Sequence, residues 1–238
     1  AITGSQKALM LPPGLGYVAL SERAWKAVEA NKARREFYLD LAKYKKSLEN
    51  DDTPFTPANT LIAAQQVSLA MIRQETIEGV WKRTGIIAEA FRQGVQALGL
   101  QLFSQSPADS VTAVRYPAGI SDKDFRNGLK NKHNIHVAGG QGSMEGSIFR
   151  VNHMGYTDAY DALAVVAAIE HVLNSLGHKV EYGRASRLPR RCWRSCSRKR
   201  FTSGSGKPQM NMDECRWFCV HRGSSVVSSF AARAKRPC

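Results

Sequence analysis

The residues best suited to chemistry lie near the N-terminus, where a lysine stands among small residues. Gly4-Ser5-Gln6-Lys7 is followed, after six further residues, by Gly14-Leu15-Gly16 and a short apolar run. Small neighbours leave room for a flat cofactor over the backbone, and the Ser and Gln side chains can donate hydrogen bonds to a phosphate. A lysine enclosed beside a cofactor loses its proton more readily and can form a Schiff base with a carbonyl. From the residue types alone, the alternative is that Lys7 is a solvated surface charge.

A second candidate is an arginine placed among apolar residues. In Ile148-Phe149-Arg150-Val151, the alternation of a strand puts Ile148 and Arg150 on the same face. A guanidinium in such a place needs a bidentate anionic partner, and a planar carboxylate matches its geometry. Two alternatives remain open: an internal salt bridge to an Asp or Glu, and an edge-strand position that faces water.

Two further patterns do not predict a site of their own. The run Gly139-Gly140-Gln141-Gly142 lacks the strand–loop–helix context and the Lys-Ser/Thr ending of a phosphate-binding P-loop, so we expect a flexible loop that leads to Arg150. His133, His136 and His153 have no Cys or paired carboxylates at ligand spacing, and we therefore expect no metal site.

The elements that position these residues follow from hydrophobic spacing and end signals. In the first half, residues 16–20 predict a buried strand, and Ser21 is placed to cap a short helix that ends near residue 32. Two prolines and two aspartates indicate an irregular loop at 51–57. The clearest helices are expected over 58–75 and over 77–98, where Gly99 ends the helix and the stripe Ile77-Trp81-Phe91-Val95 is expected in the core.

The second half predicts strands at 100–104, 111–116, 135–138 and 148–151. Helices are expected at about 121–132, opened by Ser121, and at 157–176, with acidic residues in its first turn. Residues 99–177 thus have the order β-β-α-β-β-α, which predicts an α+β unit with helices on one face of a largely antiparallel sheet.

Charge and cysteine separate the chain into a body and a tail. The formal net charge is +14, but residues 184–238 contribute +12 and residues 1–183 only +2, and all five cysteines lie in the tail. A cysteine-free body favours an intracellular protein. The sequence has no apolar run of the roughly 20 residues that span a bilayer, and no secretory signal at its start. We therefore expect neither membrane insertion nor export.

The tail allows three interpretations. Its Cys192/Cys196 and Cys215/Cys219 pairs suggest zinc, although structural zinc sites use two-residue spacers. Its basic residues could bind nucleic acid electrostatically. We favour the third, in which residues 184–238 are disordered or out of frame because the composition changes abruptly and has no period.

The segment Ala1-Ile2-Thr3-Gly4-Ser5-Gln6-Lys7 resembles the cofactor-attachment signature of the class V pyridoxal-phosphate-dependent aminotransferases. The similarity is greatest to the alanine–glyoxylate and serine–glyoxylate (serine–pyruvate) branch. It covers about residues 1–183 in matching order and spacing, through Pro12-Pro13-Gly14, Phe37-Tyr38-Leu39-Asp40, Thr56-Pro57, residues 97–103, Gly139-Gly140-Gln141-Gly142, Arg150 and His153-Met154-Gly155.

The resemblance implies a role for four residues. Lys7 matches the lysine that carries pyridoxal 5′-phosphate and moves a proton during catalysis, and Gln6 matches a contact to the cofactor phosphate. Thr56 matches a threonine that reaches the phosphate bound in the neighbouring subunit, which implies a homodimer. Thr53 stands where the family often has an aromatic hydroxyl, so the corresponding contact is not expected here. Arg150 matches the arginine that holds the substrate α-carboxylate.

The implied fold is α/β, a partial large domain of fold type I with a C-terminal α+β small domain. We assign residues 1–98 to the end of the cofactor-binding domain plus a connecting helix, 99–183 to the small domain and 184–238 to the tail. Family chains carry well over a hundred residues before the lysine, so we expect a fragment, the C-terminal portion, with weak cofactor retention and little activity alone.

The implied activity is transfer of an amino group from alanine or serine to glyoxylate or pyruvate. Small amino acids and 2-oxo acids would be its substrates, with no membrane or nucleic-acid partner. The alternatives are a relative of the soluble hydrogenase small subunit, a lyase or desulfurase relative, and a non-catalytic protein whose basic tail binds nucleic acid. The cysteine-free body counts against a desulfurase. We expect a cytoplasmic location, with the peroxisome or mitochondrion as alternatives in a eukaryote.

Overall fold

The computed structural model describes residues 1–33, 35–185, 217–220 and 227–230. These residues form two compact units. The first contains residues 1–74 with two strands from the tail, and the second contains the described residues from Glu75 onward. In the described residues, no helix has both the length and the apolar character needed to cross a bilayer.

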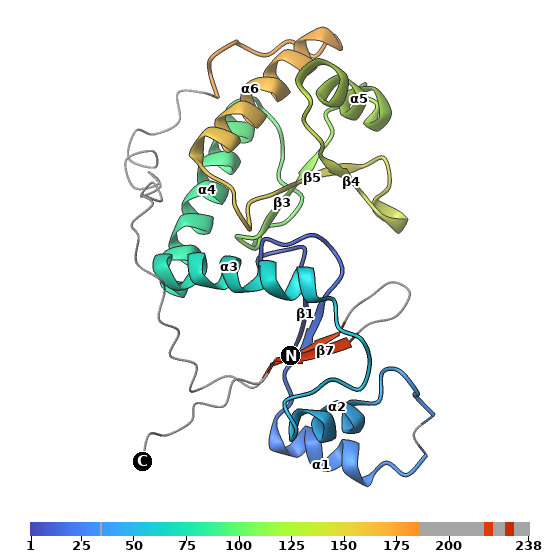
Figure 1. Cartoon of the computed structure of the whole chain (residues 1–238). Helices are drawn as coiled ribbons and strands as arrows, with labels where there is room; N and C mark the ends of the chain where they lie inside the picture. The colour runs from blue at the N-terminus through green and yellow to red at the C-terminus, as the bar shows by residue number, and fades with distance from the viewer. Residues whose placement is uncertain (34, 186–216, 221–226, 231–238) are drawn as a thin grey trace. The chain divides into compact units, whose positions relative to one another are not determined.

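The first unit combines an antiparallel sheet with three helices (Figure 1). The sheet has the order β1-β2-β6-β7, with β1 at Ile2–Gly4, β2 at Gly16–Val18, β6 at Trp217–Val220 and β7 at Val227–Phe230. The helices are α1 (Glu22–Ala30), α2 (Leu41–Leu48) and α3 (Asn59–Glu75). Apart from β6, β7 and residues 184–185, the tail lies outside the described residues. Its predicted disorder or frame change therefore stays a prediction, as do the zinc and nucleic-acid alternatives.

The signals at helix ends account for α1 and also for a helix that the sequence did not predict. Ser21 caps α1 by accepting a hydrogen bond from the Ala24 N–H, as predicted. Helix α2 falls in residues 33–50, for which the sequence predicted no element, because lysines interrupt the apolar positions. Its N-cap is Asp40, whose carboxylate accepts from the Ala42 N–H, and its buried residue is Tyr44. The cap was visible in the sequence, but one buried position in eight residues gives no helical stripe.

The second unit is the α+β arrangement that the sequence predicts, a three-stranded antiparallel sheet of order β3-β5-β4 with helices packed against it (Figure 1). Its strands are β3 (Val111–Arg115), β4 (Ala138–Gly139) and β5 (Ile148–Asn152). Its helices are α4 (Ile77–Ala97), α5 (Asp122–His133) and α6 (Ala159–Ser175), with a 3-10 turn η1 at Gly142–Met144. Residues 77–98 were assigned to the first domain, but α4 packs on α6 and β3 and is grouped with the second unit.

The core of the second unit lies between the helices and one face of the sheet. Phe149 and Val151 on β5 and Val114 on β3 pack against buried residues of all three helices, namely Phe91, Val95, Leu98, Phe125, Leu129, Val166, Ala168, Ile169, Val172 and Leu173. Arg150 lies between Phe149 and Val151 in sequence, so its side chain is on the opposite face.

Two predicted strands are shorter in the structure than expected. In residues 100–104, Leu102 alone pairs, as an isolated bridge to Val114, and Ser104 then bonds to the Ser106 N–H as the chain turns away. In residues 135–138, Ile135 donates its N–H to the Leu129 carbonyl and so completes the end of α5. Ile135 and Val137 still pack against the core. The apolar runs thus predicted correctly that these residues pack against the core. They did not predict which backbone groups the residues hydrogen-bond to, because those groups lie in other parts of the chain.

The expected apolar stripe on α4 is buried over part of its length. Phe91 and Val95 are fully buried, whereas Ile77 is 45% exposed and Trp81 is 64% exposed. The prediction that these two residues belong to the core is therefore wrong for this unit. Helical spacing identifies the apolar face of a helix, but it does not say how far along the helix a packing partner extends.

Candidate active site

Lys7 lies in the turn that follows β1, on the exposed side of the first unit. Strand β1 delivers the chain to this turn, and the chain returns through Gly14 to β2, which pairs with β1 from Ile2↔Val18 to Gly4↔Gly16. The Lys7 side chain makes no ion pair or hydrogen bond with another described residue. The amine is therefore available to a bound molecule.

Ser5 closes the loop that carries Lys7. It is fully buried, and its hydroxyl donates to the Pro12 carbonyl at 2.8 Å and accepts from the Leu15 N–H at 3.1 Å. Its own N–H donates to the Leu15 carbonyl at 2.9 Å, and its carbonyl accepts from the Leu11 N–H at 3.1 Å. A hydroxyl has a single hydrogen to donate, and here the Pro12 carbonyl takes it. The expectation that Ser5 donates to a phosphate is therefore wrong, and Ser5 instead holds the loop.

Gln6 remains available where Ser5 is not. Its side chain is exposed and folds back over Gly4, so that a Cβ added to Gly4 would lie 2.6 Å from Gln6 Oε1. Glycine at position 4 thus gives the Gln6 amide its place beside the Lys7 turn. An amide there can donate two hydrogen bonds.

The Lys7 loop is packed against α3. Leu11, Leu15 and Tyr17 form a buried cluster with apolar residues at the start of that helix, namely Ala58, Leu61, Ile62 and Ala64. The Tyr17 hydroxyl also bonds to the Gln65 side chain, and Gln65 Nε2 donates to Ser68 Oγ at 2.6 Å. This buried polar chain was not predicted. Gln65 and Ser68 are three apart on a helix, but nothing local in the sequence identifies Tyr17 as their partner.

Thr56 lies in the loop before α3 and is exposed. The nearby Thr53 is used by the loop itself, because its hydroxyl donates to the Phe55 carbonyl at 2.7 Å and its N–H bonds to Asp52 Oδ1 at 2.7 Å. Of the two threonines, Thr56 is the one whose side chain makes no hydrogen bond with another described residue.

Arg150 lies on the face of the β3-β5-β4 sheet opposite the helices, between two small residues. Its direct cross-strand neighbours are Ala113 on β3 and Ala138 on β4, which leave space around the guanidinium. Its Nε donates to the Gly139 carbonyl at 2.9 Å. In the part of the chain that the structure describes, Arg150 makes no salt bridge. The alternative of an internal ion pair is thus not supported there, and both terminal nitrogens can still donate.

The loop from β4 to β5 is folded tightly onto itself. The Gly140 N–H donates to the Ile148 carbonyl at 2.9 Å, and the Ser147 N–H donates to the Met144 carbonyl at 3.1 Å. A Cβ added to Gly140 would lie 1.8 Å from the Met144 carbonyl oxygen, so only glycine fits there. This loop holds the Gly139 carbonyl in place for Arg150, a contact that the glycine run did not predict. The predicted flexibility of the loop stays a prediction.

His153 is buried beside the end of β5. Its Nε2 is bonded to Thr112 Oγ1 at 2.8 Å, and Arg92 also reaches Thr112 and bonds to the Asp109 carboxylate at 3.2 Å. Burial and, next, the positive charge of Arg92 lower the pKa of His153 to about 4, so the ring is neutral at pH 7. In the described residues, no three His, Cys, Asp or Glu side chains are grouped as metal ligands.

The predicted site residues fall into two groups. Lys7, Gln6 and Thr56 belong to the first unit, with the Lys7 loop packed on the helix that follows Thr56, and Arg150 belongs to the second unit. The sequence reasoning missed Ser5 as the residue that fixes the loop. No local signal identifies it, because Pro12 and Leu15 come near Ser5 only when the loop closes.

Comparison with known proteins places these residues in a family. No protein-family model matches the sequence. An uncharacterized aminotransferase of Methanocaldococcus jannaschii is 44% identical over 183 residues, which cover 76% of this chain and 48% of that protein. The soluble hydrogenase 42 kDa subunit of Anabaena cylindrica is 39% identical over 179 residues, covering 74% and 46%. The serine–glyoxylate aminotransferase of Methylorubrum extorquens is 34% identical over 190 residues, covering 77% and 47%.

Solved structures agree with these relatives. The crystal structure of pyridoxamine–pyruvate aminotransferase from Mesorhizobium loti matches with a TM-score of 0.76 and 32% identity, over 82% of this chain and 51% of that one. The chain thus spans about half the length of the proteins it matches. Over that length it belongs to the class V aminotransferase family, and its fold is the type I fold of that family.

Proposed function

We propose that the chain contributes the lysine and the substrate arginine to a pyridoxal-phosphate-dependent transaminase. The amino donor would be a small amino acid, alanine or serine, and the acceptor glyoxylate or pyruvate. The observation that carries the proposal is the exposed, unengaged Lys7 on a loop that the buried Ser5 closes. The serine–glyoxylate aminotransferase among the relatives supports the choice of substrates.

The residues around Lys7 fit a flat phosphorylated cofactor. The Lys7 amine and the Gln6 amide are exposed and lie next to each other in one turn, while Ser5 keeps the turn closed from below. Pyridoxal phosphate, when bound, withdraws electrons from the substrate Cα and so makes its proton acidic. Lys7 would hold the cofactor. Its amine, once released, would remove the proton from the substrate Cα and deliver a proton to C4′ of the cofactor.

Two residues would bind the cofactor phosphate. Gln6 would donate from its amide within the same chain, beside Lys7. Thr56 would donate its hydroxyl to the phosphate held by a second copy of the chain, which makes the proposed enzyme a homodimer. Its exposure and the absence of a hydrogen bond to another described residue support this assignment.

Arg150 would bind the carboxylate that amino-acid and 2-oxo-acid substrates share. The Gly139 carbonyl fixes Nε, so the two terminal nitrogens are left to form paired hydrogen bonds with the two carboxylate oxygens. Ala113 and Ala138 leave the approach to the guanidinium open. Since donor and acceptor present the same group, one arginine would serve both halves of the reaction.

A second candidate function comes from the hydrogenase subunits among the relatives. The Anabaena protein of that name matches the same segment of this chain at 39% identity. Sequence similarity at this level does not separate the two functions. Amino-group transfer measured directly does.

Trapping the lysine tests the cofactor assignment. The chain is incubated with pyridoxal phosphate, reduced with borohydride and digested, and the labelled peptide is identified by mass spectrometry. We expect the label on Lys7, with its loss in Lys7→Ala and its retention in Lys26→Ala, which removes another exposed lysine of the same unit. Label spread over several lysines to the same extent as on Lys7 would contradict the proposal.

Kinetics of the holoenzyme that contains this chain test Arg150. Arg150→Lys keeps the charge but not the paired donors, so the KM for the amino acid and for the 2-oxo acid should both rise about 10–100-fold. The control is Arg115→Lys, at the end of β3 in the same sheet. An unchanged KM for both substrates would remove Arg150 from its role, and the lack of any amino-group transfer by the unaltered enzyme would favour the second candidate.

A further inference from the structure

A pair of histidines joins α5 to α6 on the surface of the second unit. His133 is the last residue of α5 and His171 lies near the end of α6, and the two helices run side by side in Figure 1. His133 Nε2 lies 2.8 Å from His171 Nδ1, with the ring planes nearly perpendicular. His133 and His171 are 38 residues apart, so the sequence pattern does not link them.

The close packing of the helices brings the two rings together. A Cβ added to Gly128 on α5 would lie 2.9 Å from Val172 Cγ1 on α6, so the absence of a side chain at Gly128 allows the approach. Val172 is the neighbour of His171 and is fully buried, which fixes the backbone below the pair. The rings themselves remain at the surface, with His171 exposed and His133 half-buried.

The separation of the two nitrogens matches that of two ligands on one metal ion. Imidazole nitrogens bind such ions at about 2.0–2.1 Å, so two of them at right angles lie about 2.9 Å apart, and two at a tetrahedral angle about 3.3 Å apart. The observed 2.8 Å is the length of a hydrogen bond between the two rings, so the nitrogens already lie close to the separation that two ligands of one ion require. Cu(II) and Ni(II) prefer right angles between ligands, in square-planar or tetragonal geometry, and imidazole is a suitable ligand for both.

We propose that His133 and His171 form a two-histidine site for a divalent metal ion of square-planar preference, Cu(II) or Ni(II). Each ring would turn so that its free lone pair faces the ion, and water would fill the other positions, because no group of three ligand side chains occurs in the described residues. The site is independent of the proposed transaminase function.

The electrostatic setting of His133 suits a cation ligand. The residue stands in the last turn of α5, where the unpaired carbonyls give the helix end a partial negative charge. The positive charge of Lys132, also in the last turn of α5, repels the ion, but the lysine side chain is long and flexible, so its ammonium group can move away.

Copper titration of the intact chain tests the site. The chain carries no polyhistidine tag, and its five cysteines are first alkylated so that they neither bind nor reduce the metal. We expect one Cu(II) per chain, with two nitrogen ligands in the electron paramagnetic resonance spectrum and weaker binding of Zn(II). Bound Cu(II) should also raise the unfolding temperature of the second unit, because it joins two elements of the folded state.

Matched histidine variants complete the test. His133→Gln and His171→Gln should each weaken Cu(II) binding about tenfold or more, because one ligand of two is lost. His136→Gln and His178→Gln, which alter histidines outside the pair, should leave it within about twofold. Equal binding in all four variants would place the metal elsewhere, such as at the N-terminal amine, and would overturn the proposal. So would an unaltered chain that binds no Cu(II), or a spectrum with a single nitrogen ligand.

Discussion

The polar side chains of the Lys7 loop and of the loop before α3 divide into those that bond to their own loop and those that do not. Ser5 and Thr53 each donate to a backbone carbonyl of their own loop. Lys7 and Gln6 are exposed and make no hydrogen bond with another described side chain. The backbone groups of the Lys7 loop find their hydrogen-bond partners in the Ser5 side chain and in other backbone groups, so the loop does not require the Lys7 side chain for its fold. The geometry of Lys7 is therefore set by Ser5.

At the residue scale, His153 makes the stability of the second unit depend on pH. The folded state holds the pKa of His153 at about 4, below the 6.5 of an unfolded histidine, so protons favour the unfolded chain. Its contribution is fully present above about pH 6.5 and is lost as the pH falls toward 4. We expect the unit to lose about 2 kcal/mol between pH 7 and pH 5, measured by hydrogen exchange of the β3 and β5 amides.

The variant His153→Gln should remove this pH dependence, since glutamine can still bond to Thr112 and does not titrate. His133→Gln serves as a comparison, because the pKa of His133 is lowered as well but its ring is only half-buried at the surface. If His153→Gln shows the same loss between pH 7 and pH 5 as the unaltered chain, the buried histidine is not its source.

The site residues themselves illustrate what a sequence can predict. Lys7, Gln6, Thr56 and Arg150 were named from motif order, and their roles stay predictions. The partners of Ser5 could not be named, because Pro12 and Leu15 come near it only when the loop closes. Which polar groups remain free for a ligand is thus decided by tertiary contacts that no local pattern records.

At the element scale, helices were predicted better than strands for a physical reason. A helix is ended by residues within a few positions of it: Ser121 caps α5 and the Asp158–Asp161 pair forms a capping box on α6. A strand needs a partner from elsewhere in the chain. Residues 100–104 and 135–138 have strand-like composition, yet Leu102 forms just one bridge and the pairing of β4 is limited to Ala138–Gly139.

Two glycines of the β4–β5 loop should respond differently to alanine. At Gly140 the added Cβ would overlap the Met144 carbonyl, so the loop must open, and we expect Gly140→Ala to cost about 2–4 kcal/mol of stability. Gly142 has a φ of 56° and open space around it, so Gly142→Ala should cost about 1–2 kcal/mol, from backbone strain alone. Urea unfolding measures both.

Opening this loop also moves the Gly139 carbonyl that holds Arg150. The hydrogen exchange rate of the Gly140 amide, which bonds to Ile148, reports on the loop directly. Equal stability of the Gly140→Ala and Gly142→Ala variants would show that the loop yields to the added methyl group without opening.

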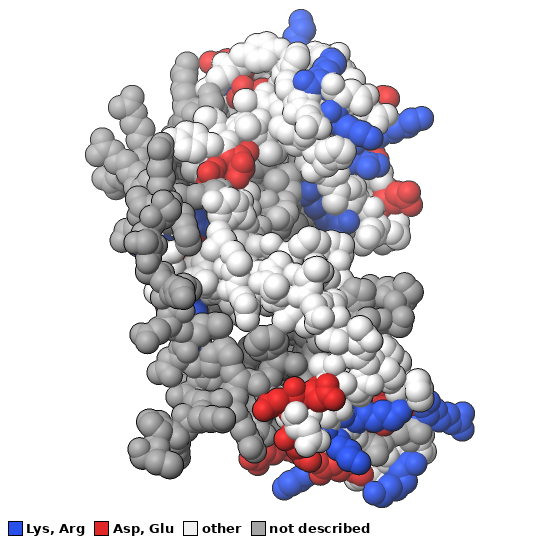
Figure 2. Space-filling view, in the orientation of Figure 1, with Lys and Arg blue, Asp and Glu red and all other residues white. Residues whose placement is uncertain are grey.

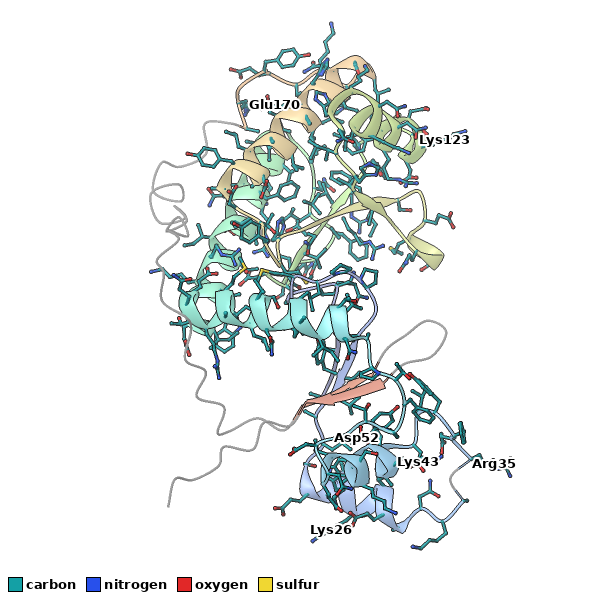
Figure 3. The ribbon with its side chains drawn as sticks, in the orientation of Figure 1. Lys26, Arg35, Lys43, Asp52, Lys123 and Glu170 are labelled. Carbon is teal, nitrogen blue, oxygen red and sulfur yellow. The ribbon has the colours of Figure 1, made fainter. Side chains whose placement is uncertain are left out.

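At the scale of the whole molecule, the sequence places most of the positive charge in residues 184–238, whose side chains lie outside the described residues apart from those of 184 and 185. Around α1 and α2, Figure 2 shows Lys and Arg side chains together with Asp and Glu side chains, as expected for a body of net charge +2. Within the described residues, Glu170, which is labelled in Figure 3, binds the backbone of the second unit where the body meets the basic tail. The buried Glu170 carboxylate accepts from the Gly183 N–H at 3.0 Å and from the Ala185 N–H at 2.9 Å.

Glu170 should therefore be needed to hold the end of the second unit. In Glu170→Gln, one of the two N–H groups faces the amide NH2 and loses its acceptor, which should cost about 1–3 kcal/mol. Faster exchange of the Gly183 and Ala185 amides would measure the release. Glu181→Gln, an exposed position in the same segment, should leave both rates unchanged; faster exchange in that variant too would mean that the segment responds to any loss of charge.

The Glu170 contact also determines which sequences can follow the fold. Both of its hydrogen bonds come from backbone N–H groups, which every residue except proline possesses, and of the side chains in this segment Ala185 is the one that is buried. The Glu170 carboxylate thus binds two backbone N–H groups and does not depend on the side chains at positions 183 and 185 for its hydrogen bonds. A different exon or reading frame joined after residue 182 would be held equally well, provided that it has no proline at the two bonded positions and a small residue at the second. Such a junction is open to exchange of its C-terminal sequence without loss of the domain before it.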